Sequence, residues 1–91
     1  MSKLNILKDL PEKNMYHKDT TSLKWKEDLI NFFKDKNLKS CLEIGTCKGV
    51  TTKVLSHLFD QVYTIENNPS RLNEAKQFCQ NRNNINFIFI C

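Results

Sequence analysis

The sequence lacks the cysteine and histidine patterns that bind a structural metal ion. Its four cysteines, at positions 41, 47, 79 and 91, form no Cys-x-x-Cys pair, and no cluster of cysteine or histidine has zinc-ligand spacing. The number of cysteines is even, but Cys41 falls in a run that is expected to form a buried strand, so the count alone does not indicate disulfides. We therefore expect no metal site and reduced thiols, as in a cytosolic protein.

Long apolar runs are also missing. No stretch approaches the ~20 consecutive apolar residues that a membrane span requires. The first twenty residues carry scattered lysines and no continuous apolar block, which argues against a secretory signal. We therefore expect a cytoplasmic protein with no membrane partner.

Positive charge is in modest excess only. The formal net charge is +4, and residues 1–39 hold nine lysines against six acidic residues, whereas residues 40–91 hold five basic against four acidic residues. Because acidic residues are interspersed among the lysines, a solvated surface explains the excess better than a nucleic-acid-binding patch.

The pattern of apolar residues predicts alternating helices and strands within one small domain of 91 residues. Strands are expected at residues 40–44, 61–65 and 85–90, with helices at residues 23–36, after Gly49, and from Pro69, which Asn68 would cap. Such alternation is typical of an α/β protein with a Rossmann-like parallel sheet, here with strand order 3-2-1. We expect an N-terminal arm over residues 1–19 and a partial cofactor-binding domain over residues 20–91.

The predicted helices each have an expected buried side. In the first helix the apolar face comprises Trp25, Leu29, Ile30, Phe32 and Phe33. In the second helix, the apolar side comprises Val50, Val54, Leu55, Leu58 and Phe59, whereas Lys53, Ser56 and His57 are expected to face solvent. The third helix is expected to turn inward Leu72, Ala75, Phe78 and Cys79.

A glycine-containing turn between the first strand and the second helix marks the candidate site. Gly45 can adopt a positive φ and lets a ligand approach the backbone closely, while Gly49 leaves space for the turn to enter the helix. The helix then presents unpaired N–H groups and the positive end of its dipole to an anion. In such sheets, ligands bind outside the carboxyl ends of the strands, where Glu43 and Glu66 both fall.

The two acidic residues favour a nucleoside that carries an amino acid over a dinucleotide. Glu66 lies twenty-one residues after Gly45, where a carboxylate can accept two hydrogen bonds from a ribose diol. Glu43 would repel a phosphate but suits an ammonium group. The turn also lacks the middle glycine and the final spacing of the G-x-G-x-x-G fingerprint, so a nicotinamide-nucleotide module remains the weaker alternative.

The segment Leu-Glu-Ile-Gly-Thr-x-x-Gly-x-Thr-Thr, at residues 42–52, closely resembles the first motif of class I S-adenosylmethionine-dependent methyltransferases. It is very similar to that of the small O-methyltransferases of the caffeoyl-CoA and catechol type. The Thr20-Thr21-Ser22 segment, about twenty residues before Glu43, gives weaker support, because those enzymes often carry threonine or serine there. The resemblance covers residues 20–91 and implies an S-adenosylmethionine cofactor, a small-molecule methyl acceptor and O-methyl transfer.

The resemblance also implies roles for individual residues around the methionine part of the cofactor. Glu43 would hold its amino group, Thr51 would donate a hydroxyl to its carboxylate, and Thr21 would close over it. Gly45 and Thr46 would line the cofactor through their backbone. The position of Cys47 is most often glycine in the motif but is variable in the O-methyltransferase branch.

At the nucleoside end, the resemblance implies that Glu66 takes the ribose hydroxyls and that Asn67 borders the adenine.

Simpler interpretations stay open beside these roles. Glu43 could be a surface acid, Glu66 could serve only the dipole of the helix that follows it, and Thr51 could be an ordinary first-turn residue. Cys47, near a helix N-terminus, could act as a nucleophile, but the sequence places no histidine to assist it.

The sequence ends after the third predicted strand, before the point where the family has its further strands and its catalytic or metal-binding acids. We therefore expect a fragment, a truncated gene or a split product, with catalytic residues outside these 91 residues. The first strand would then have an open edge. That edge could pair with the missing C-terminal half or with another copy, so a non-catalytic binding or assembly module is the alternative.

Overall fold

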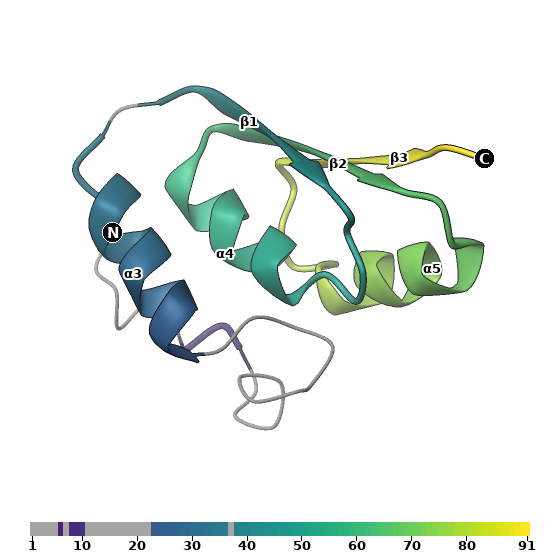
Figure 1. Cartoon of the computed structure of the whole chain (residues 1–91), viewed down its shortest axis with the longest axis horizontal. Helices are drawn as coiled ribbons and strands as arrows, with labels where there is room; N and C mark the ends of the chain where they lie inside the picture. The colour runs from purple at the N-terminus through teal and green to yellow at the C-terminus, as the bar shows by residue number, and fades with distance from the viewer. Residues whose placement is uncertain (1–5, 7, 11–22, 37) are drawn as a thin grey trace.

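A three-stranded parallel sheet forms the centre of the computed structural model, which describes residues 6, 8–10, 23–36 and 38–91 (Figure 1). Its elements in chain order are α3 (Leu23–Phe33), β1 (Ser40–Ile44), α4 (Val50–Leu58), β2 (Gln61–Glu66), α5 (Pro69–Phe78) and β3 (Ile85–Phe89). The strands are ordered β1-β2-β3, which confirms the predicted α/β class. This is also the predicted order 3-2-1, counted from the other edge of the sheet. The expected bounds differ from these by three residues at most.

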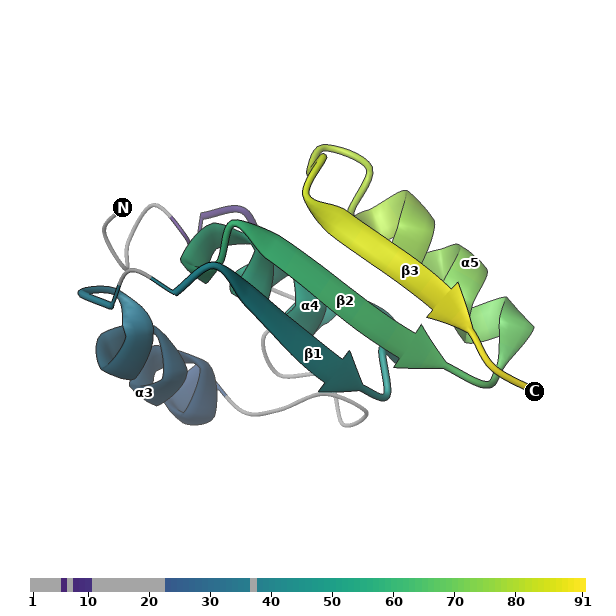
Figure 2. The same cartoon turned by 90° about the horizontal axis from the view of Figure 1, so that it is seen from above.

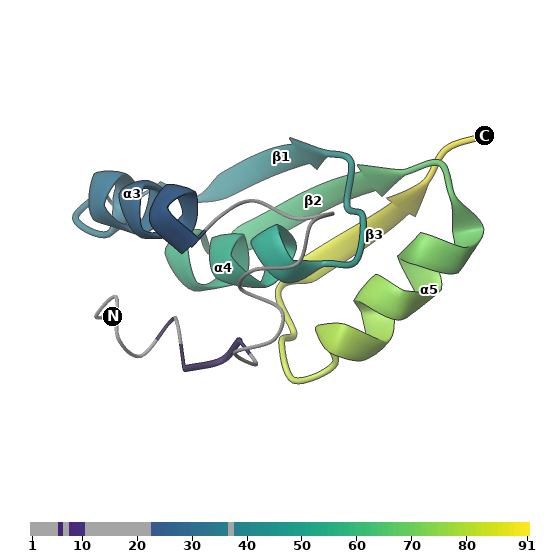
Figure 3. The same ribbon diagram turned by 60° about the horizontal axis from the view of Figure 1, so that its bottom comes forward.

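All three labelled helices lie on one side of the sheet, with α4 and α5 against it and α3 beside α4 (Figures 2 and 3). The parallel register pairs Glu43 with Thr64, and Thr64 in turn with Phe87. Side chains alternate between the two faces of a strand, so Val62, Thr64 and Glu66 all point toward the helices, where they are buried.

The start of α5 follows the sequence prediction closely. Asn68 caps the helix, since its side-chain oxygen accepts hydrogen bonds from the backbone N–H groups of Ser70, at 3.0 Å, and Arg71, at 3.2 Å. Pro69 occupies the first helical position, where its missing N–H costs nothing. The cap fixes where the chain leaves β2, which positions the carboxyl end of that strand.

Residues on more than one side of α4 are buried: Val50, Thr52, Lys53, Val54 and Ser56. Val50 and Val54 pack in a cluster with Ile6, Leu10 and Ile30, so the N-terminal segment and α3 both cover this helix. The prediction that Lys53, Ser56 and His57 face solvent is therefore wrong. Lys53 is only 5% exposed, and Ser56 and His57 are also withdrawn from solvent.

Asp9 connects the N-terminal segment to α4 and to the loop after α5. Its carboxylate lies 2.8 Å from Nε2 of His57 and 3.6 Å from Nζ of Lys53, and it accepts a 2.8 Å hydrogen bond from the Asn81 amide. The ammonium group of Lys53 also lies 4.2 Å from the centre of the Phe78 ring, at cation–π distance. These contacts explain how polar residues predicted to face solvent are accommodated inside.

Acidification is expected to destabilise the fold in the range where His57 titrates. Burial lowers the pKa of His57 and outweighs Asp9, which raises it. The unfolded chain then binds this proton more readily than the folded protein, so stability falls as the pH drops below about 6.5, the ordinary histidine value. Urea unfolding at pH 7.5 and 5.5 measures the effect, and His57→Gln should flatten the difference. An equal pH dependence in that variant would contradict this origin.

The sheet face that points away from α4 and α5 carries apolar side chains in solvent. Leu42 is 61% exposed and Ile44 82% exposed, with Tyr63 and Ile88 on the same face. The expectation that the first strand is buried is wrong for this face, because β1 is an edge strand and no helix in the described ranges covers that side. Cys41, on the opposite face, is half-buried.

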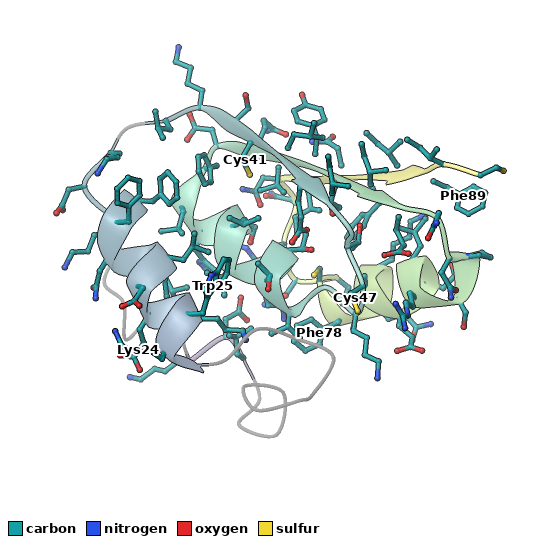
Figure 4. All side chains as sticks on the ribbon, viewed as in Figure 1. Lys24, Trp25, Cys41, Cys47, Phe78 and Phe89 are labelled. Carbon is teal, nitrogen blue, oxygen red and sulfur yellow. The ribbon has the colours of Figure 1, made fainter. Side chains whose placement is uncertain are left out.

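The orientation of α3 also differs from the prediction. Lys26 and Ile30, one helical turn apart, are fully buried, whereas Trp25 and Phe32 are largely exposed (Figure 4 labels Trp25). The buried side of α3 therefore includes fewer apolar residues than the predicted apolar face, because Trp25 and Phe32 belong to that face but are exposed. Burial also lowers the pKa of the Lys26 ammonium group.

No helix among the described residues is long and apolar enough to cross a membrane. The same residues contain no group of three or more side chains placed to bind a metal ion.

Candidate functional site

The loop at residues 45–49 turns the chain from the end of β1 into α4 by means of three left-handed residues. Gly45 has φ +95°, Cys47 +53° and Gly49 +89°, which confirms the positive φ expected at Gly45. The N–H groups of Gly45 and Thr46 both donate to the carbonyl of Ile65, at 2.8 and 3.1 Å. The loop is thus fastened to β2 at the carboxyl edge of the sheet.

The two glycines meet different surroundings. A Cβ atom on Gly45 would have no neighbour within 4 Å, so a ligand can approach this part of the backbone. A Cβ atom on Gly49 would lie 2.9 Å from the Cβ of Ala75 and 3.2 Å from Sγ of Cys79. Gly49 therefore allows α5 to pack tightly against the loop, beyond its expected role in letting the turn enter the helix.

Glu66, at the end of β2, is buried and accepts three backbone hydrogen bonds. Its Oε1 atom accepts from the N–H of Cys47 at 2.7 Å, and its Oε2 atom accepts from those of Asn67 and Asn68 at 3.1 and 3.0 Å. Burial raises the pKa of this carboxyl, but the backbone N–H groups outweigh it and hold the pKa below its ordinary value. Glu66 thus stays ionised and ties the loop to the carboxyl end of β2.

These bonds limit how Glu66 can meet a ligand. A carboxylate has about four lone-pair positions, and three are already used, with the remaining one on Oε1. A ribose diol that bonds to both oxygens must therefore replace at least one backbone N–H.

Glu43, at the end of β1, is held by two threonines. Its Oε1 atom accepts a hydrogen bond from Thr64 Oγ1 at 2.8 Å and another from Thr52 Oγ1. Burial raises the pKa of Glu43, the two hydroxyls lower it and the nearby Glu66 charge raises it, with a net upward shift. No group of the described residues donates to Oε2, which is free to receive a cation.

The structure brings most of the predicted site residues to one edge of the sheet. Glu43, Gly45, Thr46, Cys47, Glu66 and Asn67 lie at the ends of β1 and β2 and in the loop between β1 and α4, where Figure 4 labels Cys47. The side chain of Thr46 is buried and lies 2.6 Å from the Thr64 hydroxyl, so only its backbone is left for the lining role expected from the resemblance. Thr51 is half-buried in the first turn of α4, and Thr21 lies outside the described residues.

Sequence reasoning missed Thr52 and Thr64. Thr64 could have been found, because it stands two residues before Glu66 and therefore points to the same face of β2, opposite Glu43 on the neighbouring strand. Thr52 could not be separated from Thr51, since only the rotation of α4 decides which of the two threonines faces Glu43.

An open hollow of about 400 Å³ lies between the loop and α5, lined by Lys48, Glu74, Gln77 and Phe78. Neither Glu43 nor Glu66 contributes to it. The hollow is therefore separate from the carboxylate pair.

Known structures resemble the chain, although its sequence has no close match. No protein-family model matches it, and no curated protein matches it. A protein assigned as a caffeoyl-CoA O-methyltransferase from Staphylococcus aureus is 27% identical over the whole chain, with a TM-score of 0.60, and the chain covers 45% of it. Coclaurine N-methyltransferase, bound to N-methylheliamine and S-adenosylhomocysteine, is 14% identical with a TM-score of 0.64, and the chain covers 31% of it.

A third similar structure is precorrin 8W decarboxylase from Methanobacterium thermoautotrophicum, which is 14% identical over 88% of this chain, with a TM-score of 0.67. The chain spans less than half the length of each of these proteins. The predicted resemblance is confirmed: the chain has the fold of part of a class I methyltransferase.

Proposed function

We propose that the carboxyl edge of β1 and β2 binds S-adenosylmethionine and that the chain is the cofactor-binding portion of a methyltransferase. The observation that carries the proposal is the pair of acidic residues, Glu43 and Glu66, at neighbouring strand ends on either side of a glycine loop. Support also comes from the likeness to methyltransferase structures, one of them bound to S-adenosylhomocysteine.

The site geometry suits the amino-acid end of this cofactor. The Oε2 atom of Glu43, which has no donor among the described residues, would accept a hydrogen bond from the cofactor's ammonium group. The open backbone at Gly45, with the backbone of Thr46 next to it, would lie against the methionine part. Thr51, in the first turn of α4, would donate to the carboxylate. Thr21 would close over this part, as proposed from the sequence alone.

The nucleoside end would lie against β2. Glu66 would accept hydrogen bonds from the ribose hydroxyls and Asn67 would border the adenine, while Cys47 would contribute its loop backbone. The bound cofactor supplies the methyl group, and this chain's residues bind and orient it for transfer. We further propose a cytoplasmic enzyme with a small-molecule acceptor. The proposed reaction is O-methyl transfer, because the 27%-identical protein is assigned as a caffeoyl-CoA O-methyltransferase.

The groups that bind the acceptor and complete the catalytic centre are proposed to lie outside residues 1–91. The chain matches less than half of each similar structure. The division into an arm over residues 1–19 and a partial domain over residues 20–91 belongs to the same proposal.

A second candidate function is a non-catalytic module that assembles through its sheet. It is favoured by the exposed Leu42 and Ile44 on β1, which has no strand partner on its outer side among the described residues. Dimer formation at micromolar concentration, with cofactor binding but no turnover, would support it. Turnover restored by adding a C-terminal half would support the enzyme.

Isothermal titration of the 91-residue chain with S-adenosylhomocysteine tests the proposed site, with a circular-dichroism melt as the folding control. We expect saturable binding, with weaker binding of NAD because Glu43 repels a pyrophosphate. A folded chain that binds NAD more tightly than S-adenosylhomocysteine would overturn the proposal in favour of a nicotinamide-nucleotide module. A folded chain that binds neither would favour the assembly module.

A further inference from the structure

Three threonines from three parts of the chain form a hydrogen-bonded group with Glu43, two by direct contact and one through Thr64. Thr46 comes from the loop, Thr64 from the middle of β2 and Thr52 from the first turn of α4. All three side chains are buried. Thr46 Oγ1 lies 2.6 Å from Thr64 Oγ1, which in turn lies 2.8 Å from Glu43 Oε1.

The number of hydrogens fixes the direction of this chain of bonds. A hydroxyl has one hydrogen to donate, and that of Thr64 is used on the Glu43 carboxylate. Thr46 must therefore be the donor in its short contact with Thr64. Bonds that run in one direction polarise one another, so the hydroxyl of Thr46 strengthens the bond from Thr64 to Glu43.

Both donors meet the same carboxylate oxygen. Thr64 approaches Oε1 of Glu43 from the sheet and Thr52 approaches it from α4, while Oε2 receives no donor from the described residues. A carboxylate held in this way cannot exchange its two oxygens by rotation without breaking two bonds. The hydroxyls also favour the ionised form of a carboxyl whose burial works against it.

We infer that Thr64, acting with Thr46 and Thr52, is a positioning residue that favours the ionised form of the Glu43 carboxylate and turns its Oε2 atom toward the ammonium group of the ligand. The inference rests on the proposed function for the ligand. The arrangement of Glu43 itself can be tested without any ligand. Because Thr46 belongs to the loop, the same hydroxyl chain also links the loop conformation to the state of Glu43.

The first test is a titration of the glutamate side-chain carboxyls by ¹³C NMR in the ligand-free 91-residue chain, with Glu43→Gln used to assign the Glu43 signal. Thr64→Val removes the hydroxyl at nearly constant volume and should raise the pKa of Glu43. Thr64→Ser retains the hydroxyl and should restore it. An unchanged Glu43 pKa in folded Thr64→Val would overturn the inference.

The second test compares S-adenosylhomocysteine with 5′-methylthioadenosine, which lacks the amino-acid portion. Thr64→Val should weaken binding of S-adenosylhomocysteine about tenfold, near the lower end for one hydrogen bond to a charged group, and leave 5′-methylthioadenosine unchanged. Equal losses for both ligands would indicate a merely structural role and overturn the inference.

Ser56→Ala is the matched control. Ser56 is a buried hydroxyl that bonds within α4 and to Arg82, away from Glu43. Its loss should lower stability but leave the Glu43 pKa and the ratio of the two ligand affinities unchanged. If Thr64→Val does not fold, Thr52→Val is tested instead, because it removes the other hydroxyl that donates to Oε1 of Glu43.

The two proposals fail in different ways. If the folded wild-type chain binds neither ligand, the proposed function fails, while the titration of Glu43 still decides whether the threonines control its ionisation. If the wild-type chain binds S-adenosylhomocysteine but the Glu43 pKa is insensitive to Thr64→Val, the positioning role fails and the proposed function stands.

Discussion

Glu66→Ala is expected to weaken binding of S-adenosylhomocysteine by about 2–4 kcal/mol, or about 30- to 900-fold. The alanine loses the charge-assisted bonds proposed for the ribose diol. It also leaves the N–H groups of Cys47, Asn67 and Asn68 without their acceptor, so the loop that lines the ligand loosens. Isothermal titration at pH 7.5 measures the loss.

Two glutamine variants separate these contributions. Glu66→Gln retains one acceptor oxygen but loses the charge, so its affinity should lie between those of the wild type and Glu66→Ala. Glu43→Gln should cost less than Glu66→Ala, because an amide oxygen can still accept a bond from an ammonium group. A larger loss for Glu43→Gln would reverse the order of the two acids.

One result would contradict the proposal that Glu66 accepts hydrogen bonds from the ribose hydroxyls. If Glu66→Ala melts at a lower temperature but binds S-adenosylhomocysteine with wild-type affinity, the carboxylate serves only the backbone N–H groups that it contacts. The simpler interpretation, an acid that serves only the dipole of the helix that follows it, would then be sufficient.

Gly49→Ala is expected to lower the free energy of unfolding by about 2–5 kcal/mol, the sum of backbone strain and overpacking. The residue has φ +89°, and an added Cβ would lie 2.9 Å from the Cβ and 3.1 Å from the Cα of Ala75. The backbone of α5 cannot yield as a flexible side chain would, so the loop and the helix must separate. Urea denaturation followed by circular dichroism measures the change.

Gly45→Ala provides the matched control. Gly45 has a similar φ of +95°, but its added Cβ would meet no atom within 4 Å, so only the backbone strain of about 1–2 kcal/mol should appear. Equal losses for the two variants would contradict the packing role of Gly49. Gly49→Ala combined with Ala75→Gly should recover part of the loss, because one of the two clashing methyl groups is removed.

Local signals in the sequence were sufficient for the order and type of the elements. The run at residues 40–44, the glycines that follow it and the Asn68-Pro69 start of α5 each depend on neighbours within a few residues. The placement of Glu43 and Glu66 at one edge then follows from parallel pairing alone. The candidate site was predictable to that extent.

Burial of individual side chains was less predictable, because it depends on partners far along the chain. The periodicity of α4 assumed one covered side. Ile6 and Leu10 pack with Val50 and Val54, but Asp9 also contacts Lys53 and His57, so these two polar side chains are enclosed as well. The apolar residues of β1 suggested burial on both faces, which would require a layer that no described helix supplies over Leu42 and Ile44.

The sequence by itself determined the order of helices and strands, the glycine loop and the two acids. Each of these depends on residues close together in the sequence and on the alternation of side chains along a strand. Only the tertiary structure decided that Thr52 rather than Thr51 contacts Glu43, that Thr64 joins it and that Gly49 packs against Ala75. The physical reason is that these contacts depend on the rotation and spacing of α4 and α5 against the sheet. That rotation is set by the sum of many packing contacts, and no short segment encodes it.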